Sequence, residues 1–257
     1  MQDGASLKRS LGLATVVSLG INGVIGQGIF LLPGKAAGMM GPAAGVALLL
    51  GGVLCFLIAL CFAEVSTRFD TTGGAYLYAR EAFGDFVGFE VGWMTCCVGI
   101  ISWAALSNGF TLVLSHFIPE VAEGWLKSAV TVGVITALTA VNWMGAHRGA
   151  AVVKFFTVAK LVPLTLFILV GAFFIDGARF EPFAPQGTAP LAETTMLLLY
   201  AYAGFETLVV PAGEMANPQK NVPRALFIVM ILVTVIYMSI FGVALGTFDG
   251  IAGHSNP

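Results

Sequence analysis

The stretch INGVIGQGIFLLPG, Ile21 to Gly34, decides the fold because it places helix breakers inside a long apolar run. It contains four glycines, one proline and two side-chain amides, and no charged residue occurs between Arg9 and Lys35. Within a bilayer, a broken helix frees N–H and C=O groups that lipid cannot satisfy, at a cost of several kcal/mol each. Such a break persists only against protein or a water-filled cavity.

The composition of the whole chain indicates a membrane protein. Hydrophobic residues make up 58% of the 257 residues and charged residues 10%, against roughly 25% charged in soluble domains. The net charge of -2 and the absence of charge runs give no reason to expect a nucleic-acid partner. The cysteines lie in apolar runs without metal-ligand spacing, so we expect reduced packing residues, no metal and no cofactor.

Seven apolar segments are long enough to cross about 30 Å of hydrocarbon. Two of them carry charge near the middle, Lys160 in the fifth and Glu206 in the sixth. We therefore expect an all-α membrane protein that forms one membrane domain over residues 1–257. The segments are residues 10–34, 36–63, 91–119, 128–147, 149–175, 190–215 and 225–248.

The distribution of lysine and arginine between the loops predicts the orientation, because positive loops stay in the cytoplasm. With the amino terminus inside, the inner loops receive Lys8, Arg9, Arg68, Arg80, Arg148, Lys154, Lys220 and Arg224. The outer loops receive Lys35, Lys127 and Arg179. We expect a multi-pass protein of the plasma membrane with a cytoplasmic amino terminus.

The break around Gly26, Gln27 and Gly28 has two interpretations. Half-helix termini facing the interior would present free N–H groups that attract an anion such as a carboxylate. Alternatively, the glycines serve close helix packing, since glycine is frequent in membrane helices. This stretch alone leaves both interpretations open.

A second interrupted segment favours a ligand site. The stretch LLLYAYAGFETLVVPAGE, Leu197 to Glu214, is apolar, interrupted by Gly204, and carries Glu206. Two broken spans are the sequence pattern typical of a transporter site. They are the first and sixth spans, as expected if a five-helix unit is repeated in inverted topology, over residues 10–175 and from residue 190 onward.

Lys160 lies near the middle of its span. It follows Gly149 by eleven residues, about 16 Å along a helix. A charge at that depth costs roughly 2.5–3.5 kcal/mol or more and indicates a functional residue. A structural ion pair and snorkelling of the side chain are the alternatives, and snorkelling is strained at this depth.

Three motifs carry a family resemblance: VIGQGIF from Val24, FAEVSTRFDTTGGAYLYAREAFG from Phe62, and AYAGFETLVVPAGEMANPQKNVPRA from Ala201. In this order they resemble the amino acid–polyamine–organocation (APC) transporters, over nearly the whole chain. The resemblance implies a LeuT-type fold of two inverted five-helix repeats with discontinuous helices 1 and 6. Family members usually have twelve spans, so we expect this chain to be the amino-terminal half. Asp70 replaces a frequent proline of the family.

The resemblance also implies the residues of a substrate site. The substrate carboxylate is expected at the backbone N–H groups of Gly26, Gln27 and Gly28, and the amine at the carbonyls of Val24, Tyr200 and Ala203. A pocket wall or gate is implied for Tyr200, Trp103, Ser107 and Gly204. Lys160 matches a lysine whose ammonium group takes the place of a sodium ion beside the first span, and Glu206 is the second candidate for coupling.

We therefore expect a secondary transporter that moves an amino acid by alternating access, with protons as the coupling ion in symport or exchange. A non-transporting amino acid sensor or accessory subunit shares every site residue and remains an alternative, as does an inactive half-length fragment. An enzyme is not expected, because no HExxH or GxSxG motif occurs and GVIGQGIF lacks the strand–turn–helix context of a dinucleotide loop.

Overall fold

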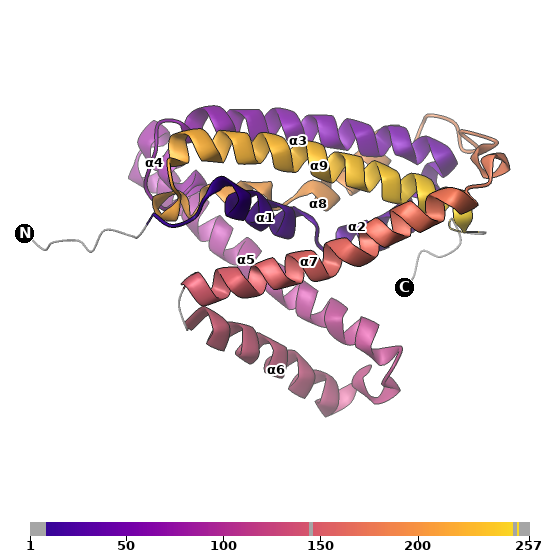
Figure 1. Cartoon of the computed structure of the whole chain (residues 1–257), viewed down its shortest axis with the longest axis horizontal. Helices are drawn as coiled ribbons and strands as arrows, with labels where there is room; N and C mark the ends of the chain where they lie inside the picture. The colour runs from indigo at the N-terminus through magenta and orange to yellow at the C-terminus, as the bar shows by residue number, and fades with distance from the viewer. Residues whose placement is uncertain (1–8, 144–145, 249–250, 252–257) are drawn as a thin grey trace, which may run out of the picture. The chain divides into compact units, whose positions relative to one another are not determined.

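The computed structural model describes residues 9–143, 146–248 and 251. These residues form α-helices and short 3-10 helices (Figure 1), and the only β-pairing among them is a single parallel bridge between Leu11 and Met215. The chain divides into two compact units, one made of residues 1–74 with 154–257 and the other of residues 75–153.

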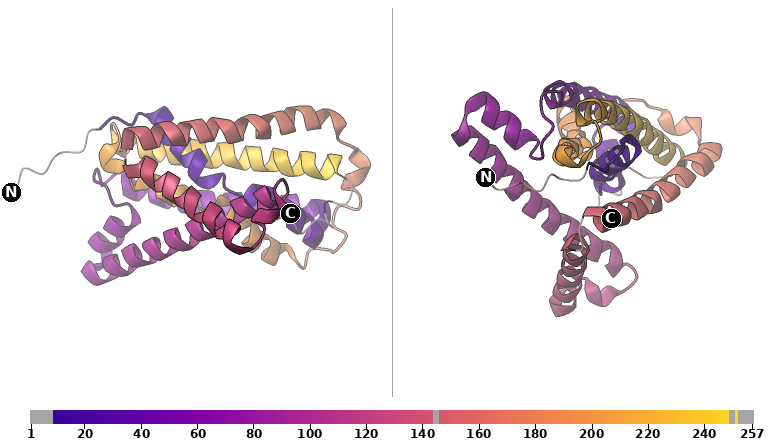
Figure 2. Two further views of the ribbon diagram at one scale, coloured as in Figure 1. Left: turned by 90° about the horizontal axis from the view of Figure 1, so that it is seen from below. Right: turned by 60° about the vertical axis from the view of Figure 1, so that its left-hand side comes forward.

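The first unit contains both interrupted segments. Its helices are α1 (Leu13–Val24), α2 (Gly28–Met40), η1 (Gly41–Ala43), α3 (Ala44–Ser66), most of α7 (Ala146–Gly171), η3 (Ala172–Phe174), η4 (Gly177–Phe180), α8 (Leu191–Tyr202), η5 (Phe205–Val209), η6 (Ala212–Glu214) and α9 (Pro218–Thr247). Helix α3 lies along α9 and α8, and Figures 1 and 2 show α3 and α9 side by side. Helix α1 lies against α9, and α2 against α8.

Small residues on one face of α3 make this close packing possible. Ala44, Ala47, Gly51, Cys55 and Ala59 are buried at spacings of three and four residues, which places them on one side of the helix. The opposite face is apolar but exposed, as at Leu57, which is 54% exposed. An exposed apolar face of this kind suits a helix surrounded by lipid.

The second unit begins with a helical hairpin. Helix α4 (Ala75–Phe83) folds back on α5 (Asp85–Ser115) through Gly84, whose φ of +89° suits glycine. A Cβ on Gly88 would lie 2.6 Å from the Cβ of Arg80. Gly88 therefore permits the close approach of α4 to α5. The unit also contains η2 (Pro119–Val121), α6 (Gly124–Trp143) and the start of α7.

Within the described residues, five helical stretches are long and apolar enough to cross a membrane: Gly28–Ser66, Asp85–Ser115, Gly124–Trp143, Ala151–Phe174 and Pro218–Thr247. The protein is therefore an all-α membrane protein. Helices α1 and α8 of the interrupted segments have 12 residues each, fewer than the roughly 20 that a single helix needs to cross a membrane. The count of seven spans and the inverted repeat stay predictions.

Candidate functional site

The first break lies where the glycines predicted it. Helix α1 ends at Val24 and α2 begins at Gly28, with Ile25 out of helical geometry at ψ 87°. A Cβ on Gly28 would lie 3.2 Å from the Cα of Ala201, so close helix packing explains that glycine. A Cβ on Gly26 would meet nothing within 4 Å. Packing therefore explains one glycine of this break and leaves the other facing open space.

The start of α2 presents free donors. In the described part of the chain, the backbone N–H groups of Gln27, Gly28 and Ile29 have no hydrogen-bond partner, whereas Phe30 and Leu31 donate to the Gln27 carbonyl. Gly28 and Ile29 are buried. Free N–H groups at a helix start carry partial positive charge and favour an anion. This arrangement can accept a carboxylate.

The end of α1 presents carbonyls that receive donors from distant helices. The Lys160 Nζ on α7 donates to the Asn22 carbonyl at 2.9 Å and to the Ile25 carbonyl at 2.5 Å. The Tyr237 hydroxyl on α9 lies 3.1 Å from the Val24 carbonyl oxygen, which also accepts the Gly26 N–H at 2.8 Å. Hydrogen bonds from an ammonium group are stronger than those between neutral groups. Lys160 therefore fastens α7 to the end of α1.

The second break is closed by its own residues. Helix α8 ends at Tyr202, Ala203 is extended at ψ 147°, and Gly204 takes φ +115°. The Gly204 N–H donates to Glu206 Oε2 at 2.9 Å, and Thr207 Oγ1 donates to the Gly204 carbonyl at 2.6 Å. Glu206 thus caps the turn into η5.

The two breaks lie against each other within the first unit. A Cβ on Gly204 would lie 2.4 Å from the Gly23 carbonyl oxygen, so only glycine permits this approach. The Tyr237 hydroxyl bridges the breaks, because it is 2.9 Å from the Ala201 carbonyl as well as close to that of Val24. The structure thus brings together the predicted residues Val24, Gly28, Lys160, Ala203, Gly204 and Glu206 around this junction.

Two of the carbonyls predicted for the amine already have partners. The Val24 carbonyl accepts from Tyr237 and Gly26, and the Tyr200 carbonyl accepts the Ala203 N–H at 3.3 Å. Tyr200 is 60% exposed. A carbonyl has two lone pairs, so the Tyr200 carbonyl keeps one acceptor position for a ligand.

Trp103 and Ser107 lie on α5 in the second unit. They are one turn apart, and the Ser107 hydroxyl donates to the Trp103 carbonyl at 2.8 Å. Their assignment to the pocket stays a prediction.

Sequence reasoning missed Tyr237, Asn22 and Ala201. Tyr237 is the single tyrosine of α9 and stands in a long apolar run. A buried tyrosine hydroxyl usually finds a partner, and this was the available signal. The partners themselves are 36 and 213 residues away in sequence.

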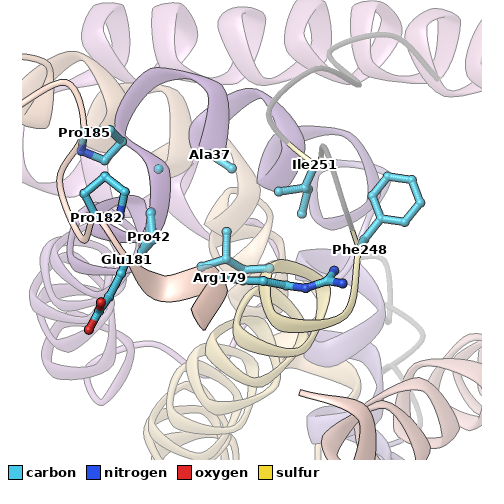
Figure 3. Close-up of a pocket in the computed structure, with 10 residues that line it drawn as sticks. Ala37, Pro42, Arg179, Glu181, Pro182, Pro185, Phe248 and Ile251 are labelled. Atoms are coloured by element: carbon cyan, nitrogen blue, oxygen red, sulfur yellow. The ribbon is translucent and has the colours of Figure 1, made fainter. Parts of the chain in front are cut away.

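A cavity of about 300 Å³ lies away from the breaks, beyond the far end of α2 (Figure 3). The residues that line it are Ala37, Gly41, Pro42, Arg179, Glu181, Pro182, Pro185, Leu245, Phe248 and Ile251. Helix α2 has 13 residues, about 20 Å. None of the predicted site residues lines this cavity.

The sequence profile of a family described as amino acid permease matches residues 11–255. The chain is 26% identical to the branched-chain amino acid permease of Bacillus subtilis (strain 168), covering 98% of this chain and 58% of that protein. It is 33% identical to the chloroplastic cationic amino acid transporter 9 of Arabidopsis thaliana, covering 86% and 42%. It is 31% identical to the serine/threonine exchanger of Bacillus subtilis (strain 168), covering 91% and 54%. The chain spans about half the length of these curated relatives.

Proposed function

Because the chain belongs to the amino acid permease family, we propose that it forms part of a secondary transporter that moves an amino acid across the plasma membrane by alternating access. The relatives are named for branched-chain amino acids, cationic amino acids and serine/threonine, which supports an amino acid as the substrate class. The single membrane domain, the LeuT-type repeat and the cytoplasmic amino terminus belong to the same proposal.

One observation carries the proposal: free N–H groups at the start of α2 stand beside the open space at Gly26, where two broken helices meet. In this proposal the N–H groups of Gln27 and Gly28 bind the substrate carboxylate, and Gly26, whose N–H donates to the Val24 carbonyl, lies at the edge of the site. The amine lies toward the end of α8, where the Ala203 and Tyr200 carbonyls accept it. The exposed Tyr200 ring and Gly204 form a wall of the proposed substrate pocket.

Lys160 and Glu206 are the proposed coupling residues. The protonated Lys160 side chain holds α7 against the end of α1 through two carbonyls. Loss of its proton weakens both hydrogen bonds, because they are no longer strengthened by the positive charge. The first break is then held less firmly, so one proton links substrate binding to the access state. Glu206 is the second candidate, since its carboxylate holds the turn at Gly204.

Ligand binding by the purified chain tests the carboxylate site. We expect one or a few of the twenty amino acids to raise the thermal midpoint, as any ligand selective for the native state does. The amide of the same amino acid keeps the side chain and the amine but loses the negative charge. Hydrogen bonds to charged groups contribute about 1.5–3 kcal/mol, so the amide should bind roughly tenfold or more weakly. Equal affinity for the acid and its amide would contradict the carboxylate site.

Uptake distinguishes transport from sensing. The whole transporter that contains this chain, reconstituted in vesicles, should accumulate the amino acid that stabilises the chain, and this uptake should saturate. Binding without uptake would favour the non-transporting sensor or accessory subunit.

A further inference from the structure

The Tyr237 hydroxyl lies between the two helix breaks. It is 3.1 Å from the Val24 carbonyl oxygen at the end of α1 and 2.9 Å from the Ala201 carbonyl oxygen near the end of α8. The side chain is 0% exposed, and its ring packs against that of Tyr202 at a centroid distance of 5.2 Å. The ring is held by packing, and the hydroxyl is aimed at both broken helices.

A phenol has one proton, whereas two carbonyl oxygens lie within its reach. At any moment only one of them receives a full hydrogen bond, or the two share the proton. The Val24 carbonyl also accepts the Gly26 N–H. Among the described residues, the Ala201 carbonyl has Tyr237 as its only hydrogen-bond partner. The hydroxyl is thus the shared partner of two helix ends.

We propose that Tyr237 is a positioning residue for the substrate site, whose hydroxyl fixes the spacing between the broken end of α1 and the end of α8. This inference rests on the proposed function, because it concerns the site formed by those breaks. The N–H groups of Gln27 and Gly28 follow Val24 by only a few residues, so the direction of Val24 sets their direction. The Tyr237 hydroxyl and the Gly26 N–H together occupy both lone pairs of the Val24 carbonyl, which leaves the substrate amine to the carbonyls at the end of α8.

Helix α9 thus provides the positioning hydroxyl, although none of the groups proposed to contact the substrate lies on α9. When the distance between the two breaks changes, the hydroxyl can keep one carbonyl while it releases the other. Helix α9 therefore stays hydrogen-bonded to one of the two helix ends in either arrangement.

Tyr237→Phe tests the proposal because it keeps the ring and deletes the hydroxyl. Tyr202→Phe is the matched control: it removes a second buried hydroxyl of the same aromatic pair, which donates to the Leu48 carbonyl at 3.2 Å, away from the breaks. Both variants are combined with Gly26→Cys in a chain without its native cysteines. A side chain at residue 26 enters open space, so its reaction rate with a thiol reagent reports on opening of the first break.

We expect Tyr237→Phe to raise the labelling rate at residue 26 about two- to tenfold, the range that corresponds to one lost hydrogen bond. Tyr202→Phe should leave the rate unchanged. Labelling in intact membranes makes the comparison independent of survival in detergent. Equal labelling rates in the two variants would overturn the proposal, and so would a rate unchanged by Tyr237→Phe.

Ligand discrimination provides a second measurement in the chain with Gly26 intact. The affinity ratio between the stabilising amino acid and its amide should fall in Tyr237→Phe, because the N–H groups no longer point at the carboxylate. A purely structural role would lower both affinities by the same factor and would contradict positioning. If no amino acid binds the unmodified chain, the proposed function fails, while the labelling comparison still decides the role of Tyr237.

Discussion

The two breaks are closed in different ways. The carbonyls at the end of α1 receive donors from α7 and α9, which lie 135 to 213 residues away in sequence. The turn after α8 is closed by Glu206 and Thr207, two and three residues from Gly204. The first break therefore depends mainly on tertiary contacts, whereas the turn of the second is closed locally and only the Ala201 carbonyl before that turn takes a donor from α9.

This difference indicates which break moves. A turn that satisfies its own backbone groups keeps its shape when neighbouring helices shift. A helix end whose carbonyls accept hydrogen bonds from side chains on other helices loses those bonds when α7 or α9 changes position. In a transporter built on both, we therefore expect the second break to act as the fixed reference and the first as the adjustable part.

The largest loss of stability is expected from a substitution at the second break. Gly204→Ala places a Cβ at φ +115° and 2.4 Å from the Gly23 carbonyl oxygen. Backbone strain and overpacking together should cost about 2–6 kcal/mol. We expect a large loss of monodisperse protein and of thermal stability. Gly26→Ala is the control, because its Cβ meets nothing within 4 Å and it should be close to neutral. Similar stability of the two variants would show that the second break is also adjustable.

The second-largest effect is expected from removing Lys160, the residue of α7 that donates hydrogen bonds to the first break. Lys160→Met keeps the length of the stem and removes both hydrogen bonds to α1. We expect the pH dependence of net amino acid uptake to be lost, while the protein still folds. The reconstituted whole transporter is the appropriate sample, with Lys154→Met as the control because Lys154 is exposed on the same helix. An unchanged rate and pH profile would exclude Lys160 as the coupling residue and leave Glu206.

A smaller effect is expected from Glu206→Gln. The amide oxygen of glutamine can still accept the Gly204 N–H that Glu206 accepts now, so only the strengthening by charge is lost, about 1 kcal/mol. Thermal stability should therefore fall slightly, and Glu206→Ala should lower it further. A change in the pH profile of uptake with Gln, at nearly unchanged stability, would assign Glu206 to coupling as well as capping.

The smallest effect is expected outside both breaks. The Arg9 guanidinium and the Asp70 carboxylate are 2.8 Å apart and about half exposed. Exposed ion pairs contribute about 0–1 kcal/mol and weaken with salt. A double-mutant cycle with Arg9→Gln and Asp70→Asn, read as thermal midpoints at low and high salt, should give a small coupling that salt removes. A coupling well above 1 kcal/mol would mean that this contact contributes as much as the helix breaks.

The sequence predicted the place of the first break because Gly26 and Gly28 interrupt an uncharged run. It also singled out Lys160, since a charge at mid-membrane depth needs a partner. The identity of the partners was harder to predict: the structure gives Asn22 and Ile25, which depend on how α1 rotates and where it ends. Tyr237 was missed because its acceptors are adjacent only after α1, α8 and α9 pack.

The backbone pairing of Leu11, just before α1, with the segment around Met215 limits how α1 can move. Leu11 exchanges two backbone hydrogen bonds with the segment before α9, at 3.1 Å from its N–H to Glu214 and 3.0 Å from the Ala216 N–H to its carbonyl. Helix α1 has 12 residues, about 18 Å, so a rotation of roughly 10° about its broken end displaces the other end by about 3 Å. That displacement exceeds what these bonds tolerate. A small tilt of α1 therefore moves residues 214–216 with it. A large rotation of α1 first has to break the two hydrogen bonds of Leu11.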